Sequence, residues 1–193
     1  MKDSASFRMI NQTENTIIRN SVSKISSDVV SFLDSLKDFL YISFYQKSNG
    51  NLSLKIFLLN QKHKILVEEI ENKDLIYEAG LYIGFIKKGN FHISLEFLEY
   101  LNKIHKISDL KQLWTSIRGE KSVLYGNNIR KEMVDKIPEG LEREDFVLIL
   151  NQSNEIIAFC RSKVNRDEID ALKPKEVIAI NLIDKGIYLR RKQ

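Results

Sequence analysis

The chain has 193 residues, of which 43% are hydrophobic and 29% charged, with 8 Gly and 2 Pro; this excludes wholesale disorder and allows one large domain or two small ones. Thirty Lys and Arg against 26 Asp and Glu give a net charge of +4, so binding to a nucleic acid would depend on where the basic residues cluster and not on their total. The single cysteine, Cys160, excludes an intramolecular disulfide and a cysteine-based zinc finger within one chain, and it fits a reducing, cytoplasmic location.

The first sixteen residues, Met1 to Thr16, are rich in Ser, Asn and Thr and contain no apolar core of the length that a secretory signal needs. We therefore expect residues 1–16 to form a flexible N-terminal tail. The longest apolar runs fall far short of the roughly 18 residues of a membrane span, so the sequence predicts a soluble protein without a membrane partner.

The region after this tail carries mixed helix and strand patterns. Apolar residues at three- and four-residue intervals predict a single amphipathic helix from Val22 to Leu40, and a later helix begins at Leu95. Two hairpins are predicted, residues 41–45 with 52–59 and residues 81–86 with 91–94, and between them a short strand at 64–67 and a helical stretch at 68–78. This half is therefore predicted to be an α+β domain with an antiparallel sheet, spanning residues 17–111.

From Leu113 the pattern changes to short β-favouring runs separated by turn residues, which is typical of a small β-barrel. The domain boundary is expected between Ile107 and Leu113, so that residues 112–193 form the second domain. The predicted strands are 113–117, 122–125, 134–137, 146–150, 155–164, 177–181 and 187–191, and the predicted helices are 128–133 and 165–172.

The titratable residues form no pattern typical of catalysis or metal binding. His63, His92 and His105 are far apart and have no partner at metal-ligand spacing, and the eight glycines are scattered rather than arranged as a phosphate-binding loop. We therefore predict a protein that is not an enzyme and has no metal and no cofactor. Paired carboxylates at Glu68 and Glu69 or within residues 142–145 are the catalytic alternative, although solvated helix faces and turns look the same.

Two further groups have an ordinary packing interpretation. The aromatic residues Phe39, Tyr41, Phe44 and Tyr45 could stack on unpaired bases, but they more often pack a hairpin against a helix. Cys160 ends an apolar run and is predicted to be a small buried side chain rather than a reactive thiol.

Basic residues of the C-terminal half gather near turns, where long side chains can converge. Arg161 and Lys163 are two apart in a predicted strand and so project from the same face, which could hold a phosphate backbone. The alternative is that these are scattered solubilising charges, because Asp167, Asp170 and other acidic residues are close by. The candidate contacts are Arg161, Lys163, Arg166, Lys173, Lys175, Arg130, Lys131, Arg190 and Arg191.

Two segments, Val123–Asn128 and Asp184–Arg191, resemble the PUA domain, a compact RNA-binding barrel. The order of helices and hairpins upstream, followed by Leu113–Ile117 directly before the barrel, is similar to that of the Nip-type large ribosomal subunit biogenesis factors, here of the archaeal kind. The resemblance covers nearly the whole chain after the tail.

This resemblance implies a pre-PUA domain joined to a PUA domain, acting in pre-rRNA processing and large-subunit assembly. It implies binding of uridine-rich single-stranded RNA by the PUA domain, docking of ribosome assembly proteins on the N-terminal domain, and a monomer. The basic part that contacts RNA in archaeal members falls on Arg161, Lys163, Arg166, Lys173 and Lys175. Because PUA barrels also accompany RNA-modifying enzymes, an RNA-modification enzyme or its accessory subunit is the alternative function.

Overall fold

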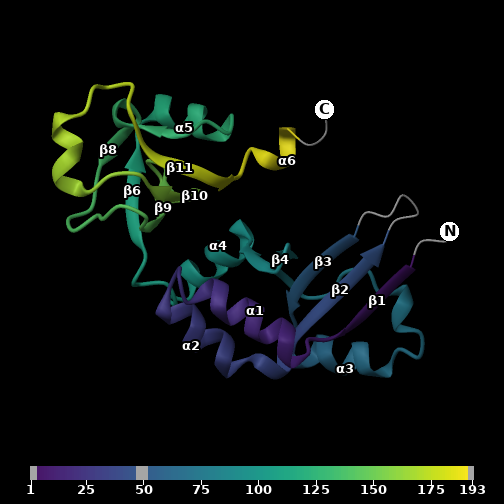
Figure 1. The fold of residues 1–193 in the computed structure, drawn as a ribbon. Helices are drawn as coiled ribbons and strands as arrows, with labels where there is room; N and C mark the ends of the chain where they lie inside the picture. Colours follow the sequence, from purple (N-terminus) through teal and green to yellow (C-terminus); the bar gives the residue numbers. More distant parts are fainter. Residues whose placement is uncertain (1–3, 47–51, 191–193) are drawn as a thin grey trace. The chain divides into compact units, whose positions relative to one another are not determined.

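The computed structural model describes residues 4–46 and 52–190, and the chain divides into two compact units, an N-terminal unit of residues 1–107 and a C-terminal unit of residues 108–193 (Figure 1). The N-terminal unit combines helices with an antiparallel sheet, and the C-terminal unit is a nearly closed barrel-like sheet with short helices. The predicted fold class is therefore confirmed.

The N-terminal unit is built on a five-stranded antiparallel sheet in the order β1-β2-β3-β4-β5. Its strands are β1 (Ser4–Met9), β2 (Leu40–Gln46), β3 (Leu52–Leu58), β4 (Leu81–Lys87) and β5 (Asn90–Ile93). Its helices are α1 (Gln12–Val22), α2 (Ser27–Ser35), α3 (Gln61–Glu69) and α4 (Leu95–Lys103), with 3-10 turns η1 (Lys37–Phe39) and η2 (Lys73–Leu75).

Different helices pack on the two faces of this sheet. On one face Phe7, Tyr41 and Phe57 form a buried cluster with Val67 of α3. Because side chains alternate along a strand, neighbouring residues such as Ile42 point to the other face, and there α1 packs on β5 and α4 on β4. Helix α3 and the segment that carries Ile76 therefore cover the first face, whereas α1 and α4 cover the second.

The predicted N-terminal tail is wrong. Strand β1 pairs with β2 from Ser4 to Met9, and Phe7 is only 1% exposed. Helix α1 follows at once, because the Asn11 side chain accepts the N–H of Glu14 at 2.9 Å and caps the first turn. The polar composition misled the prediction, since a strand at a sheet edge needs backbone pairing and only one buried anchor.

Two other predictions in this unit are wrong in their boundaries or type. The helix expected from Val22 to Leu40 has the wrong ends: α1 already stops at Val22, and a second helix runs only from Ser27 to Ser35, where the Ser26 hydroxyl accepts the N–H of Val29 and caps its first turn. The strand expected at 64–67 is part of α3, whose first turn is capped by the Asn60 side chain. Of the helix expected at 68–78, only Glu68 and Glu69 at the end of α3 are α-helical, and η2 is a 3-10 turn.

Both predicted hairpins are confirmed, with β2 paired to β3 and β4 paired to β5. The turn between the two strands of the first hairpin lies outside the described residues. In the second hairpin Lys88 and Gly89 have φ of 49° and 72°, the left-handed conformations that a two-residue turn needs to match strand twist.

The C-terminal unit contains a six-stranded sheet in the order β7-β11-β10-β9-β6-β8, in which β6 runs parallel to β9 and the other pairs are antiparallel. The strands are β6 (Lys111–Thr115), β7 (Ile129–Arg130), β8 (Val134–Lys136), β9 (Phe146–Leu150), β10 (Ile156–Ser162) and β11 (Val177–Asp184). The helical elements are α5 (Ile117–Leu124), α6 (Ile187–Arg190) and the 3-10 turns η3 (Lys131–Met133) and η4 (Arg166–Ala171).

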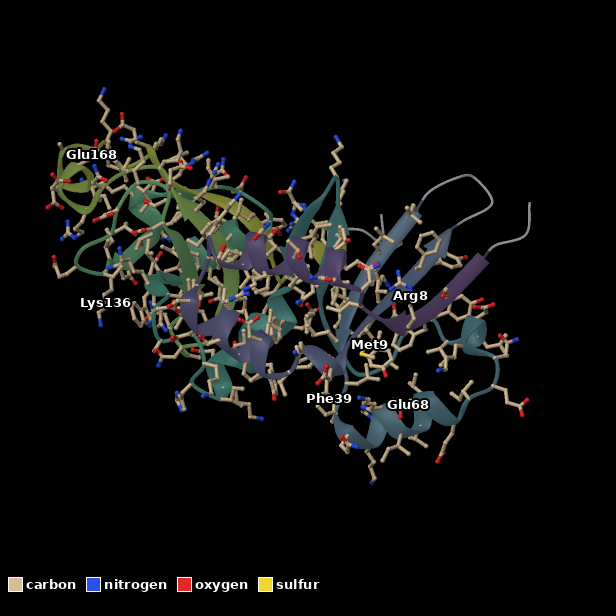
Figure 2. All side chains as sticks on the ribbon, turned by 60° about the horizontal axis from the view of Figure 1, so that its bottom comes forward. Arg8, Met9, Phe39, Glu68, Lys136 and Glu168 are labelled. Carbon is tan, nitrogen blue, oxygen red and sulfur yellow. The ribbon has the colours of Figure 1, made fainter. Side chains whose placement is uncertain are left out.

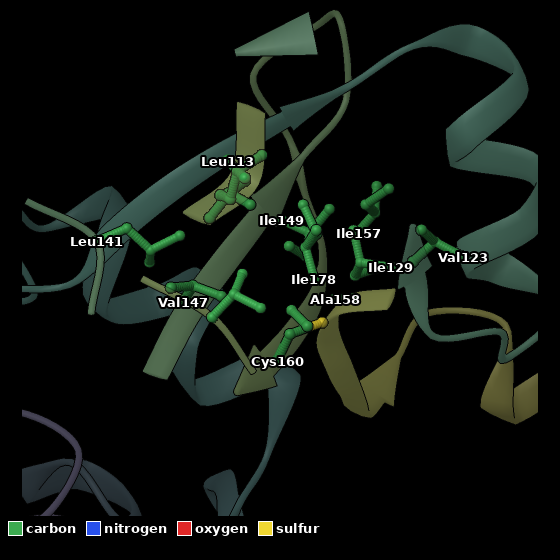
Figure 3. Close-up of a cluster of buried hydrophobic side chains, with 13 residues drawn as sticks. Leu113, Val123, Ile129, Leu141, Val147, Ile149, Ile157, Ala158, Cys160 and Ile178 are labelled. Atoms are coloured by element: carbon green, nitrogen blue, oxygen red, sulfur yellow. The ribbon is translucent and has the colours of Figure 1, made fainter. Parts of the chain in front are cut away.

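The inner side of this sheet is filled by aliphatic side chains, including Leu113, Val147, Ile157 and Ile178 (Figure 3). Cys160 belongs to the same cluster and is fully buried, as predicted. Burial in these apolar surroundings raises the pKa of the Cys160 thiol far above its ordinary value, so the thiolate is not accessible in the folded protein.

The ends of the predicted barrel differ from expectation. Residues 122–125, expected to be a strand, belong largely to α5, whose N-terminus is capped by the Ser116 hydroxyl bound to the N–H of Gly119. Residues 187–190 form α6 instead of a strand, and the helices expected at 128–133 and 165–172 are largely 3-10 turns. No helix among residues 4–46 and 52–190 is long and apolar enough to cross a lipid bilayer.

Candidate nucleic-acid interface

The beginning of β11 is the place where basic residues from three segments meet. Arg130 of β7 pairs with Val177 of β11. The backbone N–H of Lys163, just after β10, donates to the carbonyl of the following residue, Ile178, at 2.8 Å. The turn of residues 173–176 leads into the same end of β11 and carries two lysines. Strand pairing thus brings together residues that are up to 45 positions apart in the sequence.

Hydrogen bonds fix the turn that presents Lys173 and Lys175. The Glu176 N–H donates to the Lys173 carbonyl at 3.0 Å, and the Glu176 carboxylate accepts the Lys173 N–H at 2.8 Å. From the other side, the Lys131 N–H donates to the Glu176 carbonyl at 3.0 Å. Both lysine side chains are exposed on this fixed turn.

Four of the candidate basic side chains are free to bind a phosphate within the described part of the chain. The side chains of Arg130, Lys163, Lys173 and Lys175 are exposed, and none of them has a hydrogen-bond or ion-pair partner within the described part of the chain. We define these four residues as the β11 basic cluster. An unpaired ammonium or guanidinium at the surface can bind a phosphate oxygen without first breaking an internal contact.

Two further candidates are paired, and of these Arg161 is exposed while Arg166 is half-buried. Arg161 Nη1 lies 2.9 Å from Glu144 Oε2, and Arg166 Nη1 lies 3.4 Å from Asp170 Oδ2. Arg161 and Lys163 are both exposed on either side of a buried residue, so they do project from the same face. An exposed pair such as Arg161–Glu144 contributes about 0–1 kcal/mol, and a phosphate could replace that carboxylate at little cost.

Lys131 and Arg190 hold the fold together. Lys131 Nζ donates to the carbonyls of Asp170 and Leu172 at 2.8 and 2.9 Å and so satisfies the C-terminal end of η4. Arg190 makes two bonds to the carboxylate of Asp184, at 2.9 and 2.8 Å. The remaining candidate, Arg191, lies outside the described residues.

The surroundings of the β11 basic cluster are mixed in charge. Acidic side chains lie on the same turns and strands, and they include Glu132, Glu144, Asp167, Asp170 and Glu176. The cluster is therefore a small group of individual cations and not a broad positive surface. Its affinity for a polyanion must depend on a few direct contacts.

Sequence reasoning missed a second exposed group on α5. Arg118 and Lys121 are exposed on this helix, and Tyr125, directly after it, is 77% exposed. They are three and four residues apart, so they lie on one side of the helix. Helical spacing was the signal that could have revealed them, but these residues were partly assigned to a strand.

A cavity of the N-terminal unit is mainly apolar. It measures about 420 Å³ and is lined by Leu36, Phe39, Leu58, Leu59, Asn60, Gln61, His63, Leu81 and Tyr100. A histidine and a tyrosine are the titratable groups of this lining, and neither has a carboxylate beside it in the cavity wall. Within the described residues, no group of three His, Cys, Asp or Glu side chains could hold a metal ion.

Comparison with known proteins places the C-terminal unit in a family. Residues 111–193 match the model of the UPF0113 PUA domain. The C-terminal unit is a PUA domain of this family. Solved structures have the same fold. The alignment with a PUA domain protein from Aeropyrum pernix covers 97% of this chain and 90% of that protein, with a TM-score of 0.58 and 14% identity. The alignment with a conserved PUA domain protein from Thermoplasma acidophilum covers 98% of this chain and 99% of that protein, with a TM-score of 0.55 and 11% identity.

Relatives of known sequence extend the similarity beyond the PUA domain. A UPF0113 protein of Archaeoglobus fulgidus is 30% identical over 115 residues, which are 60% of this chain and 63% of that protein. The 60S ribosome subunit biogenesis protein NIP7 of Saccharomyces cerevisiae is 22% identical over 184 residues, which are 95% of this chain and 96% of that protein. The resemblance to Nip-type factors that the sequence indicated is thereby confirmed.

Proposed function

We propose that this chain binds RNA through the β11 basic cluster of its PUA domain and acts without catalysis in the assembly of the large ribosomal subunit. The cluster supports the first part, because it gathers unpaired cations from β7, the end of β10 and the turn before β11. The relatives named as ribosome biogenesis proteins support the second part.

The finer proposal is that a monomer works in pre-rRNA processing in the cytoplasm and prefers uridine-rich single strands. The N-terminal unit would meanwhile dock other ribosome assembly proteins. Single strands suit the cluster, because a flexible backbone can bring successive phosphates to cations that are not arranged on a helical groove. In this mechanism the protein positions RNA and releases it unchanged.

Affinity for RNA is expected to depend steeply on salt. Each phosphate contact contributes about −0.7 to the slope of log K against log salt for a single strand, so four contacts give a slope of about −3. Affinity should then fall roughly fifty-fold between 50 and 200 mM salt. A protein that bound RNA by stacking alone would show a much smaller dependence.

Fluorescence anisotropy of the full chain with a labelled uridine-rich oligonucleotide tests this proposal. Lys163→Ala plus Lys175→Ala should weaken binding and reduce the salt slope by about 1.4, that is by about 0.7 per charge. The matched control is Lys62→Ala, an exposed lysine of α3 in the other unit. If the double variant keeps the wild-type slope, or if Lys62→Ala changes it equally, the cluster is not the contact surface.

The alternative function is an RNA-modification enzyme or its accessory subunit. Such an enzyme needs convergent ionisable groups in a pocket, and the cavity of the N-terminal unit offers His63 and Tyr100 among mainly apolar side chains. Mass spectrometry of an RNA substrate after incubation with the chain distinguishes the two functions. A change of mass that depends on His63 would favour the enzyme.

A further inference from the structure

The segment of residues 65–78 is unusually apolar for a surface. It exposes Ile65 (46%), Leu66 (54%), Ile70 (41%), Leu75 (70%) and Tyr77 (56%). These are five of the eleven large apolar side chains that are exposed within the described residues, and they fall within fourteen consecutive positions. Clustered exposed apolar side chains with polar neighbours are typical of interaction surfaces.

Tyr77 packs edge to face on Tyr45 of β2, with ring centroids 5.7 Å apart, whereas Ile65, Leu66, Ile70 and Leu75 are exposed and do not belong to the buried core. Helix α3 buries Val67 at 4% exposure, and Ile76 packs partly against the same cluster on the sheet. Ile65 lies on the opposite side of the helix from Val67, because two residues correspond to about 200° of rotation. Figure 2 shows α3, marked by Glu68, with side chains that project away from the sheet.

The same segment is acidic in a chain that is basic as a whole. It contains Glu68, Glu69, Glu71, Asp74 and Glu78, all exposed, against one basic residue, Lys73. Two of these carboxylates are near lysines outside the segment: Glu68 lies 4.0 Å from Lys64, and Glu78 pairs with Lys55. We call residues 65–78 the acidic apolar segment.

This charge decides which partner fits. RNA and anionic lipid headgroups would be repelled by the carboxylates. A symmetric dimer through this surface would set acidic groups against identical acidic groups, which disfavours a second copy of the chain. A protein segment with apolar side chains flanked by Lys or Arg would complement both the exposed apolar residues and the carboxylates.

We propose that the acidic apolar segment docks a basic amphipathic segment of another protein. Its apolar side chains cover Ile65 and Leu66 of α3 and Ile70 directly after it, and its cations face the surrounding carboxylates. This inference deepens the proposed docking of assembly proteins on the N-terminal unit, on which it rests. It also separates the two units by chemistry: an acidic surface for protein and a basic cluster for RNA.

Photo-crosslinking of the full chain in the cells that make it identifies the occupant. The photoreactive residue p-benzoylphenylalanine replaces Leu66, and in a control chain it replaces Leu182, which is 46% exposed in the other unit. The expected product at position 66 is a protein whose crosslinked peptide has a net positive charge and regularly spaced apolar residues. Products shared with position 182, an acidic peptide, RNA, a second copy of the chain, or no specific product would each overturn the proposal.

The crosslinked peptide, made synthetically, then gives a quantitative test. Ile65→Ser plus Leu66→Ser, and separately Glu69→Lys plus Glu71→Lys, should each weaken its binding to the full chain about tenfold or more. Glu139→Lys, an exposed change in the other unit, should leave binding unchanged. Unaltered affinity in either double variant refutes the surface assignment.

RNA binding by the same variants separates this inference from the proposed function. Both double variants should bind the uridine-rich oligonucleotide as the wild type does, because the RNA-binding cluster lies in the other unit. Circular dichroism checks that their N-terminal unit is folded. If the wild type fails to bind RNA but binds the peptide, the RNA function is refuted and the docking surface stands.

Discussion

Replacing Arg190 with alanine removes a guanidinium that holds the last helix of the PUA domain against the barrel. Arg190 Nη1 and Nη2 donate to the two oxygens of Asp184, at 2.9 and 2.8 Å, and Nη1 also donates to the carbonyl of Leu124. The Asp184 side chain is 4% exposed, whereas that of Arg190 is 35% exposed. Without Arg190 the buried carboxylate would keep one hydrogen bond, from Asn181 Nδ2 at 3.2 Å.

The expected loss of stability follows from this burial. Breaking a fully buried ion pair costs about 3–5 kcal/mol, because the remaining charge is left without a partner. About a third of the Arg190 side chain is in water, which screens the pair and admits water to the carboxylate, so we expect about 2–3 kcal/mol. For a unit of this size, such a loss lowers Tm by roughly 10–20 °C.

The single tryptophan makes the measurement selective. Trp114 lies in β6 of the same unit, where its indole N–H donates to Asn154 Oδ1 at 2.8 Å and Lys136 Nζ lies 4.5 Å from its ring. Urea titration followed by tryptophan fluorescence therefore reports unfolding of the C-terminal unit. The free energy of unfolding of Arg190→Ala is compared with that of the wild type at the same pH and salt concentration.

Arg130→Ala is the matched control, because Arg130 is exposed and has no side-chain partner within the described residues. It should change the free energy of unfolding by less than about 0.5 kcal/mol while reducing RNA affinity. The opposite pattern, a stable Arg190→Ala protein that has lost RNA affinity and one charge of salt dependence, would show that Arg190 contacts RNA and that its pairing is incidental.

Four further predictions concern the packing and titration of single residues. Phe7→Ala should destabilise the N-terminal unit by about 3–5 kcal/mol in urea titration followed by circular dichroism, because it empties a site that is 1% exposed. Gly186→Ala should destabilise the C-terminal unit by about 3 kcal/mol in tryptophan fluorescence, since a Cβ there would lie 1.8 Å from a backbone carbonyl oxygen. Cys160 should not react with a thiol reagent until urea unfolds the chain, because burial raises its pKa. Partial burial raises the pKa of Glu14, but hydrogen bonds from Arg8 and a backbone N–H outweigh it and leave the pKa below its ordinary value of 4.5. The Glu14 contribution to stability is therefore present above about pH 4.5 and lost as the pH falls through the lower folded pKa, and Arg8→Ala should flatten this decline in acid titration.

Each of these predictions has a contradicting outcome. A Phe7→Ala chain as stable as the wild type would mean that β1 is not part of the cooperative unit. A Gly186→Ala chain with unchanged stability would place the Leu124 carbonyl elsewhere. Rapid labelling of Cys160 in the native protein would refute its burial. An acid transition that Arg8→Ala leaves unchanged would show that the Arg8–Glu14 ion pair does not contribute to the pH dependence of stability.

Local signals in the sequence were enough to predict both hairpins and the division into an α+β part and a barrel. Alternating apolar residues on either side of short polar turns specify a hairpin through contacts between neighbouring parts of the chain. The segments 81–86 and 91–94 were found in this way, and Lys88 and Gly89 supply the backbone conformation of their turn.

Elements whose identity depends on distant contacts were predicted wrongly. Residues 64–67 are rich in branched side chains and suggested a strand, but Val67 packs on the sheet cluster from a helix capped by Asn60. The first nine residues looked too polar for a core, yet Phe7 is buried and stacks on Tyr41 with ring centroids 5.5 Å apart. Tyr41 is thus a packing residue, as its more common interpretation held, but its cluster includes Val67 of α3 and not the first helix.

By itself the sequence determined which residues can act: the basic side chains that could bind a polyanion, the single buried thiol, and a fold class that the family match supports. Only the tertiary structure decided which of these side chains have their charge satisfied. Arg190 and Lys163 are both basic residues near a strand end, but one is bonded to the nearly buried carboxylate of Asp184 and the other is exposed and unpaired within the described residues. The reason is that a charge is satisfied by whatever lies within a few ångströms of it, and in a barrel those neighbours come from strands far apart in the sequence.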